Sequence, residues 1–220
     1  MKNKNRNKRS VNNFVFVEKK GYDFVKRIFD IVASAIMLIC LAPILLIVAL
    51  LVMTDGGPPI FTQTRVGKNG KLFKMYKFRT MIVGADSEQS LEELQELNEM
   101  DGPAFKIQDD PRITKIGKIL RKTSIDELPQ LVNIFIGNMT FVGPRPPLVK
   151  EVEKYKPYQR NRLLVKQGLT CYWQCSGRNN IMFKEWVRLD LQYIMDRSLL
   201  TDFKILLMTI PAVLSGKGAQ

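Results

Sequence analysis

Residues 121–147 read RKTSIDELPQLVNIFIGNMTFVGPRPP, and they hold the strongest local signals in the chain. The stretch begins with basic residues, continues through the adjacent carboxylates Asp126 and Glu127, and closes on a rigid proline-rich turn that carries Arg145. Phosphoryl transfer needs mainly positioning and neutralisation of charge, so a carboxylate pair among cations is a pattern that suits phosphate chemistry. We therefore expect the functional site in this stretch.

The same stretch predicts where a helix begins. Ser124 and Glu127 fit the S-x-x-E capping box, which starts a helix at Ser124 but places Pro129 awkwardly at its fifth position. With Asp126 as the cap instead, Pro129 falls in the tolerated first turn. Either helix places both carboxylates at its N-terminus, where the dipole and the free N–H groups keep a carboxylate ionised and attract phosphate. An ionised Asp126 could bind Mg²⁺ and attack phosphorus.

The composition restricts the available chemistry. The 220 residues carry a net charge of +13 and include no histidine, which excludes Ser-His-Asp and Cys-His sites and most zinc sites. Cys40, Cys171 and Cys175 are too few for a tetrahedral metal site without histidine, and they fit apolar packing in a reducing compartment. Acid, base or nucleophilic roles therefore fall to carboxylates, Lys, Tyr, Ser, Thr or Cys, and the basic balance indicates an anionic partner.

An apolar segment indicates a membrane protein. Residues 31–53 carry no charge over 23 positions, enough at about 1.5 Å per residue to cross a hydrocarbon core of about 30 Å. Basic residues flank the segment on both sides, and residues 1–27 hold nine Lys or Arg against two acids. Basic flanks mark the cytoplasmic side, and Pro43 kinks a helix at the middle of the run. A simple span and a re-entrant helix that breaks at Ala42 and Pro43 both fit this pattern.

The other segments predict a helix-rich α+β protein. Asn69 and Gly70 give the strongest short signal for a β-hairpin, whose second arm carries Lys77 and Arg79 as candidates to reach a phosphate. Seven acids and no base mark residues 84–103 as an acidic helical insertion. The predicted segments are strands at 60–64 and 72–78, helices at 85–100, 112–121, 148–164, 183–195 and 199–214, and a loop or short strand at 167–180.

Six short motifs appear in the order found in the bacterial sugar transferases, the small monotopic polyprenyl-phosphate phosphoglycosyl transferases. The chain resembles this family from residue 26 to its C-terminus. Each motif alone is modest, whereas the ordered set is highly specific. The motifs are KRIFD at 26–30, YKFRTM at 76–81, DPRIT at 110–114, RKTSIDELPQL at 121–131, VGPRP at 142–146 and SGRN at 176–179.

The resemblance implies a reaction in which a UDP-sugar gives its sugar 1-phosphate to undecaprenyl phosphate and UMP is released, with Mg²⁺ as cofactor. Asp126 matches the nucleophile that forms a covalent phosphosugar intermediate. Glu127 matches its partner, which helps to hold Mg²⁺ with Asp126 or activates the acceptor. The other implied phosphate- or substrate-binding residues are Arg79, Arg121, Arg145, Arg178 and Asp190, the role of Asp190 being open.

The resemblance also implies an organisation. It favours re-entry, with the helix breaking at Ala42 and Pro43, and it places the protein on the cytoplasmic face of the plasma membrane. Amphipathic interfacial helices would surround the catalytic core, and an inner-leaflet phospholipid would be a further partner. No nucleic acid is expected, and the oligomeric state and the sugar are left open. The implied parts are a basic, partly disordered tail (1–25), a re-entrant membrane helix (26–56) and a cytoplasmic catalytic domain (57–220).

Three residues depart from the family pattern near the expected nucleotide or sugar end. Gln167 stands where Pro is usual, Cys171 where Gly is usual, and Cys175 where a small aliphatic residue is usual. Glycine adopts backbone dihedral angles that cysteine resists, so the conformation of this loop is left open.

Two other function classes are compared with the transferase. A membrane-anchored basic module that binds anionic lipid or nucleic acid without catalysis accounts for the charge and the apolar run. It does not account for Asp126 and Glu127 among those cations, where acids weaken anion binding. A direct glycosyltransferase with paired carboxylates is disfavoured, because adjacent residues do not flank a glycosidic centre at a separation of about 5 Å or more.

Overall fold

The computed structural model describes residues 14–85, 87, 102–103, 107, 110–175 and 182–214, and it confirms a helix-rich α+β fold with small sheets. Most of the predicted helix at 85–100 and of the acidic insertion, the SGRN motif and most of the basic tail lie outside the described residues. The described elements, α-helices (α), 3-10 helices (η) and strands (β), are α1 Lys20–Met53, β1 Ile60–Val66, η2 Lys68–Gly70, β2 Leu72–Phe78, α3 Lys115–Thr123, η4 Ile125–Glu127, α4 Gln130–Ile136, β3 Thr140–Val142, α5 Val149–Glu153, η5 Pro157–Leu164, β4 Gly168–Thr170, α6 Tyr172–Cys175, α7 Phe183–Asp196 and α8 Leu199–Leu214.

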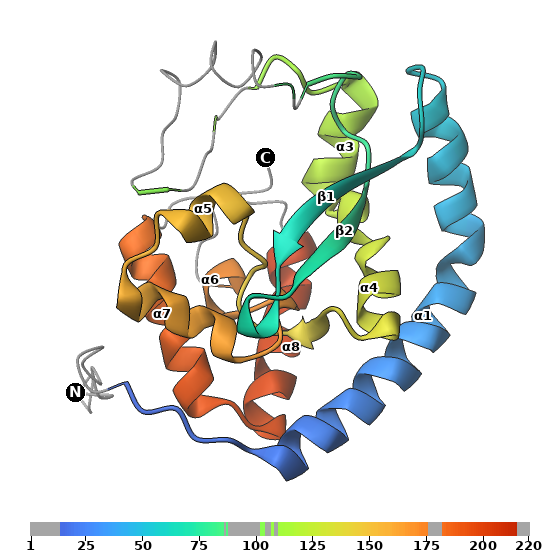
Figure 1. Ribbon diagram of the computed structural model, residues 1–220. Helices are drawn as coiled ribbons and strands as arrows, with labels where there is room; N and C mark the ends of the chain where they lie inside the picture. The colour runs from blue at the N-terminus through green and yellow to red at the C-terminus, as the bar shows by residue number, and fades with distance from the viewer. Residues whose placement is uncertain are drawn as a thin grey trace, which may run out of the picture.

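Helix α1 follows the outside of the molecule and is the one helix of the described residues that is long and apolar enough to cross a membrane. The helix continues through Ala42 and Pro43, so the interruption expected there is not present in the structure. Proline removes one backbone hydrogen bond, which bends a helix whose other bonds remain, and Figure 1 shows α1 curving around the rest of the fold. The membrane topology stays a prediction.

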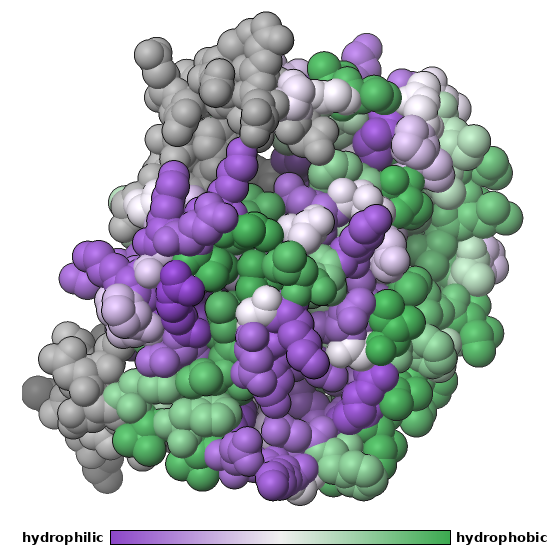
Figure 2. Space-filling model, viewed as in Figure 1, coloured by the Kyte–Doolittle hydropathy of each residue, from purple (hydrophilic) through white to green (hydrophobic). Residues whose placement is uncertain are grey.

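The outer surface of α1 is apolar along most of its length. Figure 2 shows green, hydrophobic side chains gathered on the side of the molecule where α1 lies in Figure 1. A contiguous exposed apolar surface of this kind is unusual for a protein surrounded only by water, and it is suited to contact with lipid. The exposed apolar residues of α1 include Phe24, Ile28, Ile36, Ile39, Leu46 and Leu50.

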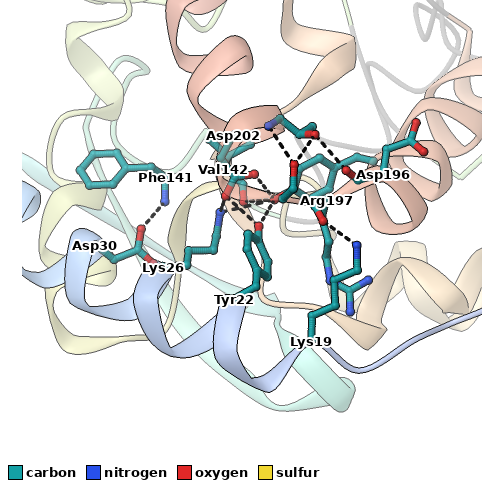
Figure 3. Close-up of polar contacts among 12 residues, drawn as sticks. Lys19, Tyr22, Lys26, Asp30, Phe141, Val142, Asp196, Arg197 and Asp202 are labelled. Carbon is teal, nitrogen blue, oxygen red and sulfur yellow. Dashed lines mark hydrogen bonds and ion pairs between the residues drawn. The ribbon is translucent and has the colours of Figure 1, made fainter.

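Polar contacts hold both ends of α1 against the rest of the protein. Near the C-terminal end, Arg79 donates to the carbonyl oxygens of Val52, Pro58 and Met81 at 2.8, 2.9 and 3.3 Å. Near the N-terminal end, Lys26 of α1 forms an ion pair with Asp202 of α8, and the Tyr22 hydroxyl donates to the same carboxylate at 2.7 Å (Figure 3). The apolar helix is therefore fixed to the fold at two places far apart along its length.

The predicted hairpin is confirmed, and its first strand, β1, extends beyond the strand predicted at 60–64. Strands β1 and β2 pair antiparallel from Ile60 opposite Phe78 to Val66 opposite Leu72. Asn69 and Gly70 adopt positive φ angles of 55° and 79° in the turn, which explains the Asn-Gly pair. Met75 and Phe78 lie on opposite faces of β2, and both are buried, in two separate clusters of the core.

The main core forms where α4, β3, α7 and α8 meet. A two-stranded parallel sheet joins β3 to β4, with Thr140 opposite Gly168. Gly168 approaches the backbone of Gly143 so closely that a Cβ atom there would lie 2.1 Å from the Gly143 nitrogen. Fully buried core side chains include Leu131, Ile134, Met139, Val187, Leu191, Ile194 and Ile205.

The remaining predicted helices are confirmed with changed bounds. The helix predicted at 112–121 is α3, which begins three residues later, because Thr114 caps it by accepting from the Gly117 N–H at 2.9 Å. The helix predicted at 148–164 is interrupted: α5 ends before Pro157, and a 3-10 helix begins there. The two C-terminal helices, α7 and α8, agree with their predictions to within one residue.

Candidate functional site

Asp126 and Glu127 lie in a turn between two helices rather than at the start of one. Helix α3 ends at Thr123, and Ser124 then adopts the left-handed conformation with φ 57° and ψ 17°. Both carboxylates belong to the 3-10 helix η4, and α4 begins only at Gln130. The prediction of a capping box at Ser124 was wrong, and the alternative cap at Asp126 was wrong as well, since neither side chain caps a helix.

The left-handed residue is a source of local strain at this site. A non-glycine residue with positive φ costs on the order of 1–2 kcal/mol, and such residues cluster where a structure holds functional groups in place. The Ser124 N–H bonds back to the carbonyl oxygen of Arg121 at 3.0 Å, which satisfies the end of α3. The chain thereby changes direction sharply and presents Asp126 and Glu127 toward β2.

Strand β2 supplies the cation that meets both carboxylates. The Lys77 ammonium lies 2.7 Å from Oε1 of Glu127 and 3.6 Å from Oδ2 of Asp126. Asn133 of α4 fixes this approach, because its side chain accepts from the Tyr76 N–H at 2.9 Å and donates to the Lys74 carbonyl at 2.7 Å. A fully buried asparagine thus joins α4 to the strand one residue before Lys77.

The two carboxylates have different environments. The side chain of Asp126 is 10% exposed, whereas that of Glu127 is 38% exposed. Burial raises the pKa of Asp126, and Glu127 raises it further, while Lys77 and Arg121 lower it. Asp126 is therefore a desolvated carboxylate kept beside two cations, and Glu127 is its neighbour on the solvent side.

Arg121 is held in place by the segment that follows β2. Its Nε atom donates to Oγ1 of Thr80 at 2.9 Å, and the Thr80 carbonyl accepts from the Thr114 N–H at 3.0 Å, just before α3 begins. Burial lowers the pKa of Arg121, and Asp126 raises it. Within the described part of the chain, no hydrogen bond is made by the two terminal nitrogens of Arg121, so they remain available to a phosphate.

A second group of charged residues surrounds Trp186. The Arg145 guanidinium lies 5.1 Å from the Trp186 ring centroid and 3.7 Å from the Glu151 carboxylate. Arg162 lies at the same distance of 5.1 Å from that ring and is fully buried. It donates to Oδ2 of Asp190 at 2.7 Å, and burial raises the pKa of Asp190 to about 6, against the lowering effect of Arg162.

Arg65 lies between the two groups. Its pKa is lowered to about 9, mainly by burial and also by Arg145, while Glu151 and Glu127 act to raise it. Its guanidinium donates to the Pro146 carbonyl at 3.0 Å, which fixes the proline-rich turn against β1. The turn that carries Arg145 is therefore held at the first strand of the hairpin whose second strand carries Lys77.

The predicted site residues thus have different placements. The structure brings Arg121 to Asp126 and Glu127, and it places Arg145 in the neighbouring Trp186 group. The Arg79 guanidinium is 7% exposed and binds three carbonyl oxygens, and Asp190 is buried on Arg162. Arg178 lies outside the described residues.

Three residues of the site had weak or no signals in the sequence. Lys77 was one of two candidates on the second arm of the hairpin. It stands between Tyr76 and Phe78 along β2, so its side chain points to the opposite face from theirs, and this alternation could have singled it out. Thr80 and Arg162 were missed, because their partners are far away in the sequence. Only its burial in the structure shows that Arg162 is the ion-pair partner of Asp190.

The three departures from the family pattern are accommodated without backbone strain. Among the described residues other than glycine, only Asn69 and Ser124 have positive φ, so Cys171 occupies an ordinary conformation. Gln167 is fully buried and donates to the carbonyl oxygens of Arg162 and Val165, both at 3.1 Å. The cysteines are free thiols, as their number suggested.

The donor set fits a magnesium ion held jointly by protein and substrate. In the part of the chain that the structure describes, no three His, Cys, Asp or Glu side chains come together as a metal cage. Mg²⁺ is commonly bound by one or two carboxylates together with substrate phosphates and water, and Asp126 and Glu127 supply two adjacent carboxylates. The Lys77 ammonium now balances their charge, so an ion at this place would share the carboxylates with it.

Comparisons with known proteins show which family the chain resembles. The family model described as bacterial sugar transferase matches residues 21–216. The galactosyl transferase CpsE of Streptococcus agalactiae is 50% identical over 203 residues, which are 92% of this chain and 45% of that protein. The undecaprenyl-phosphate galactose phosphotransferase of Salmonella typhimurium is 42% identical over 91% of this chain and 43% of its own length. The exopolysaccharide production protein ExoY of Rhizobium meliloti is 43% identical, with 88% of this chain and 87% of that protein covered. The chain therefore spans less than half the length of the first two relatives and most of the third.

Proposed function

The chain belongs to the bacterial sugar transferase family, and we propose that it moves a sugar 1-phosphate from a UDP-sugar to undecaprenyl phosphate, with release of UMP. The observation that carries the proposal is the buried Asp126 carboxylate beside Lys77 and Arg121, with Glu127 next to it. Two relatives bear names that include galactose, which makes UDP-galactose the first donor to test. The product would start the assembly of an exopolysaccharide, a capsule, an O-antigen or another glycoconjugate.

In the first half of the reaction, an oxygen of Asp126 attacks the phosphorus that carries the sugar. A bond forms between the carboxylate and phosphorus, the bond from phosphorus to the UMP oxygen breaks, and UMP leaves with the electron pair. Burial makes the carboxylate a stronger nucleophile than it is in water, because few solvent molecules stabilise its charge. Arg121, whose terminal nitrogens make no hydrogen bond to the described residues, neutralises charge on the donor phosphates, and Arg145 does so from the neighbouring group.

In the second half, an oxygen of undecaprenyl phosphate attacks the same phosphorus. The new phosphoanhydride bond forms as the bond to Asp126 breaks, which returns Asp126 as a carboxylate. Glu127 lies on the exposed side of the pair, where it can orient the incoming phosphate through a shared cation or hold a proton from it. Lys77 holds the two carboxylates in place during the exchange through its contacts with both.

Asp126 and Glu127 are the residues that would hold Mg²⁺. When bound, the ion neutralises phosphate charge and makes phosphorus more electrophilic. The Lys77 ammonium contacts the same two carboxylates and neutralises part of their charge, so it would weaken their attraction for Mg²⁺.

The exposed apolar surface of α1 supports membrane association, and we propose the cytoplasmic face of the plasma membrane as its location. The basic flanks on both sides of the apolar run favour re-entry over a span. The two are distinguished by labelling cysteines placed one at a time at Lys19 and at Lys68, in intact cells and in a variant whose three native cysteines are replaced by serine. Re-entry predicts protection of both positions from an impermeant reagent, and opposite labelling would rule it out.

The activity is tested with purified full-length protein, Mg²⁺, UDP-galactose and undecaprenyl phosphate. We expect UMP release that needs both substrates, and a panel of other UDP-sugars identifies the preferred donor. The Asp126→Asn variant should lose turnover while its thermal unfolding stays close to that of the unchanged protein. The matched control is Asp55→Asn, which removes an exposed carboxylate and should leave turnover unchanged. Normal turnover in Asp126→Asn refutes the assignment of the nucleophile.

The main alternative is a basic membrane module that binds anions without chemistry. Such a protein would show no UMP release with any UDP-sugar, and Asp126→Asn would bind anions more tightly, because it removes a negative charge from a basic site. The transferase predicts loss of turnover in the same variant, so one pair of measurements separates the two functions.

A further inference from the structure

A cleft of about 160 Å³ lies at the N-terminal end of α1, and neither Asp126 nor Glu127 lines it. One part of its lining is apolar and the other is strongly basic. The apolar part includes Phe16, Val142, Leu164 and Val165. The charged residues are five cations (Lys26, Arg27, Lys68, Lys166 and Arg197) and two acids (Asp23 and Asp30).

Three of the five cations already have partners. Lys26 forms its ion pair with Asp202, as Figure 3 shows. Arg27 donates to the carbonyl oxygens of residues 134 and 135, both at 2.7 Å, where it caps the end of α4. Arg197 donates to the carbonyl oxygens of residues 17 and 194, both at 2.5 Å. These cations hold the walls of the cleft together.

The other two cations are Lys68 and Lys166, and neither ammonium group has a hydrogen bond or an ion pair within the described part of the chain. They come from distant segments, since Lys68 is in the turn of the hairpin and Lys166 follows η5. Burial lowers the pKa of Lys166, and Arg27 and Lys68 lower it further, while Asp30 raises it. Asp30 is itself occupied, because it accepts the Phe141 N–H at 3.2 Å (Figure 3).

The cleft therefore gathers positive charge that its own acids do not balance. Lys68 is exposed and Lys166 is partly buried, and two like charges that line one cleft repel one another, so an anion that enters between them is attracted by both. A phosphate oxygen accepts from several ammonium groups at once, so it matches Lys68 and Lys166 better than a lone carboxylate does.

The cleft is separate from the Asp126–Glu127 pair. Lys68 lies in the turn before β2 begins, whereas Lys77 stands near the other end of that strand. Leu72 and Lys77 are about 17 Å apart at roughly 3.4 Å per residue, and Lys68 is farther along in the same direction. Figure 1 shows the hairpin turn pointing away from α3, so an occupant of the cleft would not touch the carboxylate pair.

The position of the cleft identifies the source of the phosphate. Lys26 and Arg27 line it and directly precede the apolar part of α1, whose outer side chains face outward. With α1 in the membrane, as proposed above, the cleft would lie at the level where lipid headgroups meet the hydrocarbon layer, and its apolar wall suits the glycerol and the first methylenes of a lipid. A free phosphate ion would use only the basic half.

We propose that this cleft binds the phosphodiester headgroup of an anionic glycerophospholipid, with Lys68 and Lys166 as its phosphate ligands. The bound lipid neutralises the two lysines and fills the space between α1, the hairpin turn and η5. It would fix the depth of α1 in the membrane relative to the transfer site.

The proposal is tested by titration calorimetry on delipidated full-length protein in an uncharged detergent. The probes are dioctanoyl phosphatidylglycerol, dioctanoyl phosphatidylcholine and inorganic phosphate. We expect the phosphatidylglycerol to bind and the other two to bind far more weakly. The double variant Lys68→Gln/Lys166→Gln should bind phosphatidylglycerol about 30-fold more weakly, at about fivefold for each lysine near a lipid phosphate.

Two further variants make the result specific. Lys71→Gln/Lys156→Gln removes the same charge from two exposed neighbours outside the cleft and should bind within twofold of the unchanged protein. Lys68→Arg/Lys166→Arg keeps the charge and should also retain binding. An equal loss in the exposed pair, or equal affinity for phosphatidylcholine, overturns the proposal.

Two competition outcomes also overturn it. Displacement of the phosphatidylglycerol by equal concentrations of inorganic phosphate would mean a free-anion site. Stronger displacement by geranylgeranyl phosphate, a short polyprenyl phosphate, would mean that the cleft receives the acceptor. Since binding is measured without turnover, the result is independent of whether the proposed transfer reaction is correct.

Discussion

Replacement of Gly117 by alanine adds one methyl group and is expected to misplace the carboxylate pair. A Cβ atom at Gly117 would lie 2.0 Å from the carbonyl oxygen of Thr80 and 2.7 Å from its carbonyl carbon. Ordinary van der Waals contact begins at 3.4 Å, so α3 and the Thr80 segment must separate by about 1.4 Å. The atoms in the way are backbone atoms, and no change of rotamer relieves the contact.

The separation reaches the site through two hydrogen bonds. Thr80 accepts from the Thr114 N–H at 3.0 Å and from Arg121 Nε at 2.9 Å, and both bonds cross the contact that must open. Because η4 follows α3 after a single left-handed residue, a shift of α3 also carries Asp126 away from Lys77. A displacement of about 1 Å at reacting groups lowers the rate by about 100-fold, which is the loss we expect in kcat.

The effect on stability should be smaller than the effect on activity. Overpacking costs about 1–3 kcal/mol, and the better helix propensity of alanine returns about 1 kcal/mol, so the net loss is expected to be at most about 2 kcal/mol. The assay is UMP release together with chemical denaturation of the same preparation. The control is Gly21→Ala in α1, where no heavy atom lies within 4 Å of the added Cβ. That variant should keep full activity and equal or higher stability. If Gly117→Ala keeps normal kcat and normal stability, the contact with Thr80 does not position the site.

Two further predictions concern charged partners. Lys77→Gln should move the acidic limb of the pH profile of kcat/KM for UMP release to higher pH. Burial raises the pKa of Asp126 and Lys77 lowers it. Without Lys77, the nucleophile therefore stays protonated at a pH where it is normally ionised. The exposed variant Lys74→Gln on the same strand should leave the profile unchanged, and coincident profiles for Lys77→Gln and the unchanged protein would contradict the assignment. Tyr155→Phe removes the hydroxyl that accepts from Arg162 at 2.6 Å and leaves a buried N–H unpaired, which should cost about 1–3 kcal/mol in the free energy of unfolding. Tyr158→Phe at an exposed position should cost much less, and similar losses in the two variants would show that the bond to Arg162 is not the cause.

The parts of the fold that the sequence predicts well are those determined by neighbouring residues. Asn69 and Gly70 adopt the positive φ angles that their side chains permit, and the hairpin follows from them. The last two helices carry apolar side chains at helical spacing, and both form with nearly the expected ends. The uncharged run predicts α1 in the same way, since its apolar character extends over many turns.

The parts that the sequence does not predict depend on contacts between distant segments. The parallel pair of β3 and β4 joins residues that are 28 positions apart, and each strand has only three residues. Arg162 is fully buried because Asp190, Tyr155 and Trp186 surround it, and no local pattern marks an arginine for that role. Pro43 predicts a break, whereas α1 continues through it as one helix that packs against α4 and is fixed at both ends.

The absence of the helix cap predicted at Ser124 or Asp126 bears on how Asp126 can act as a nucleophile. A carboxylate that caps a helix gives its lone pairs to backbone N–H groups, and those bonds stabilise the anion and lower its pKa. In the structure, Asp126 makes no such bond in its 3-10 turn, and its nearest charged partner is Lys77 at 3.6 Å. Burial without capping raises the pKa of Asp126 and leaves its oxygens free to approach an electrophile. The turn therefore suits a nucleophile better than the predicted helix N-terminus does, because the same residue in a cap would be stabilised in its ground state and occupied by hydrogen bonds.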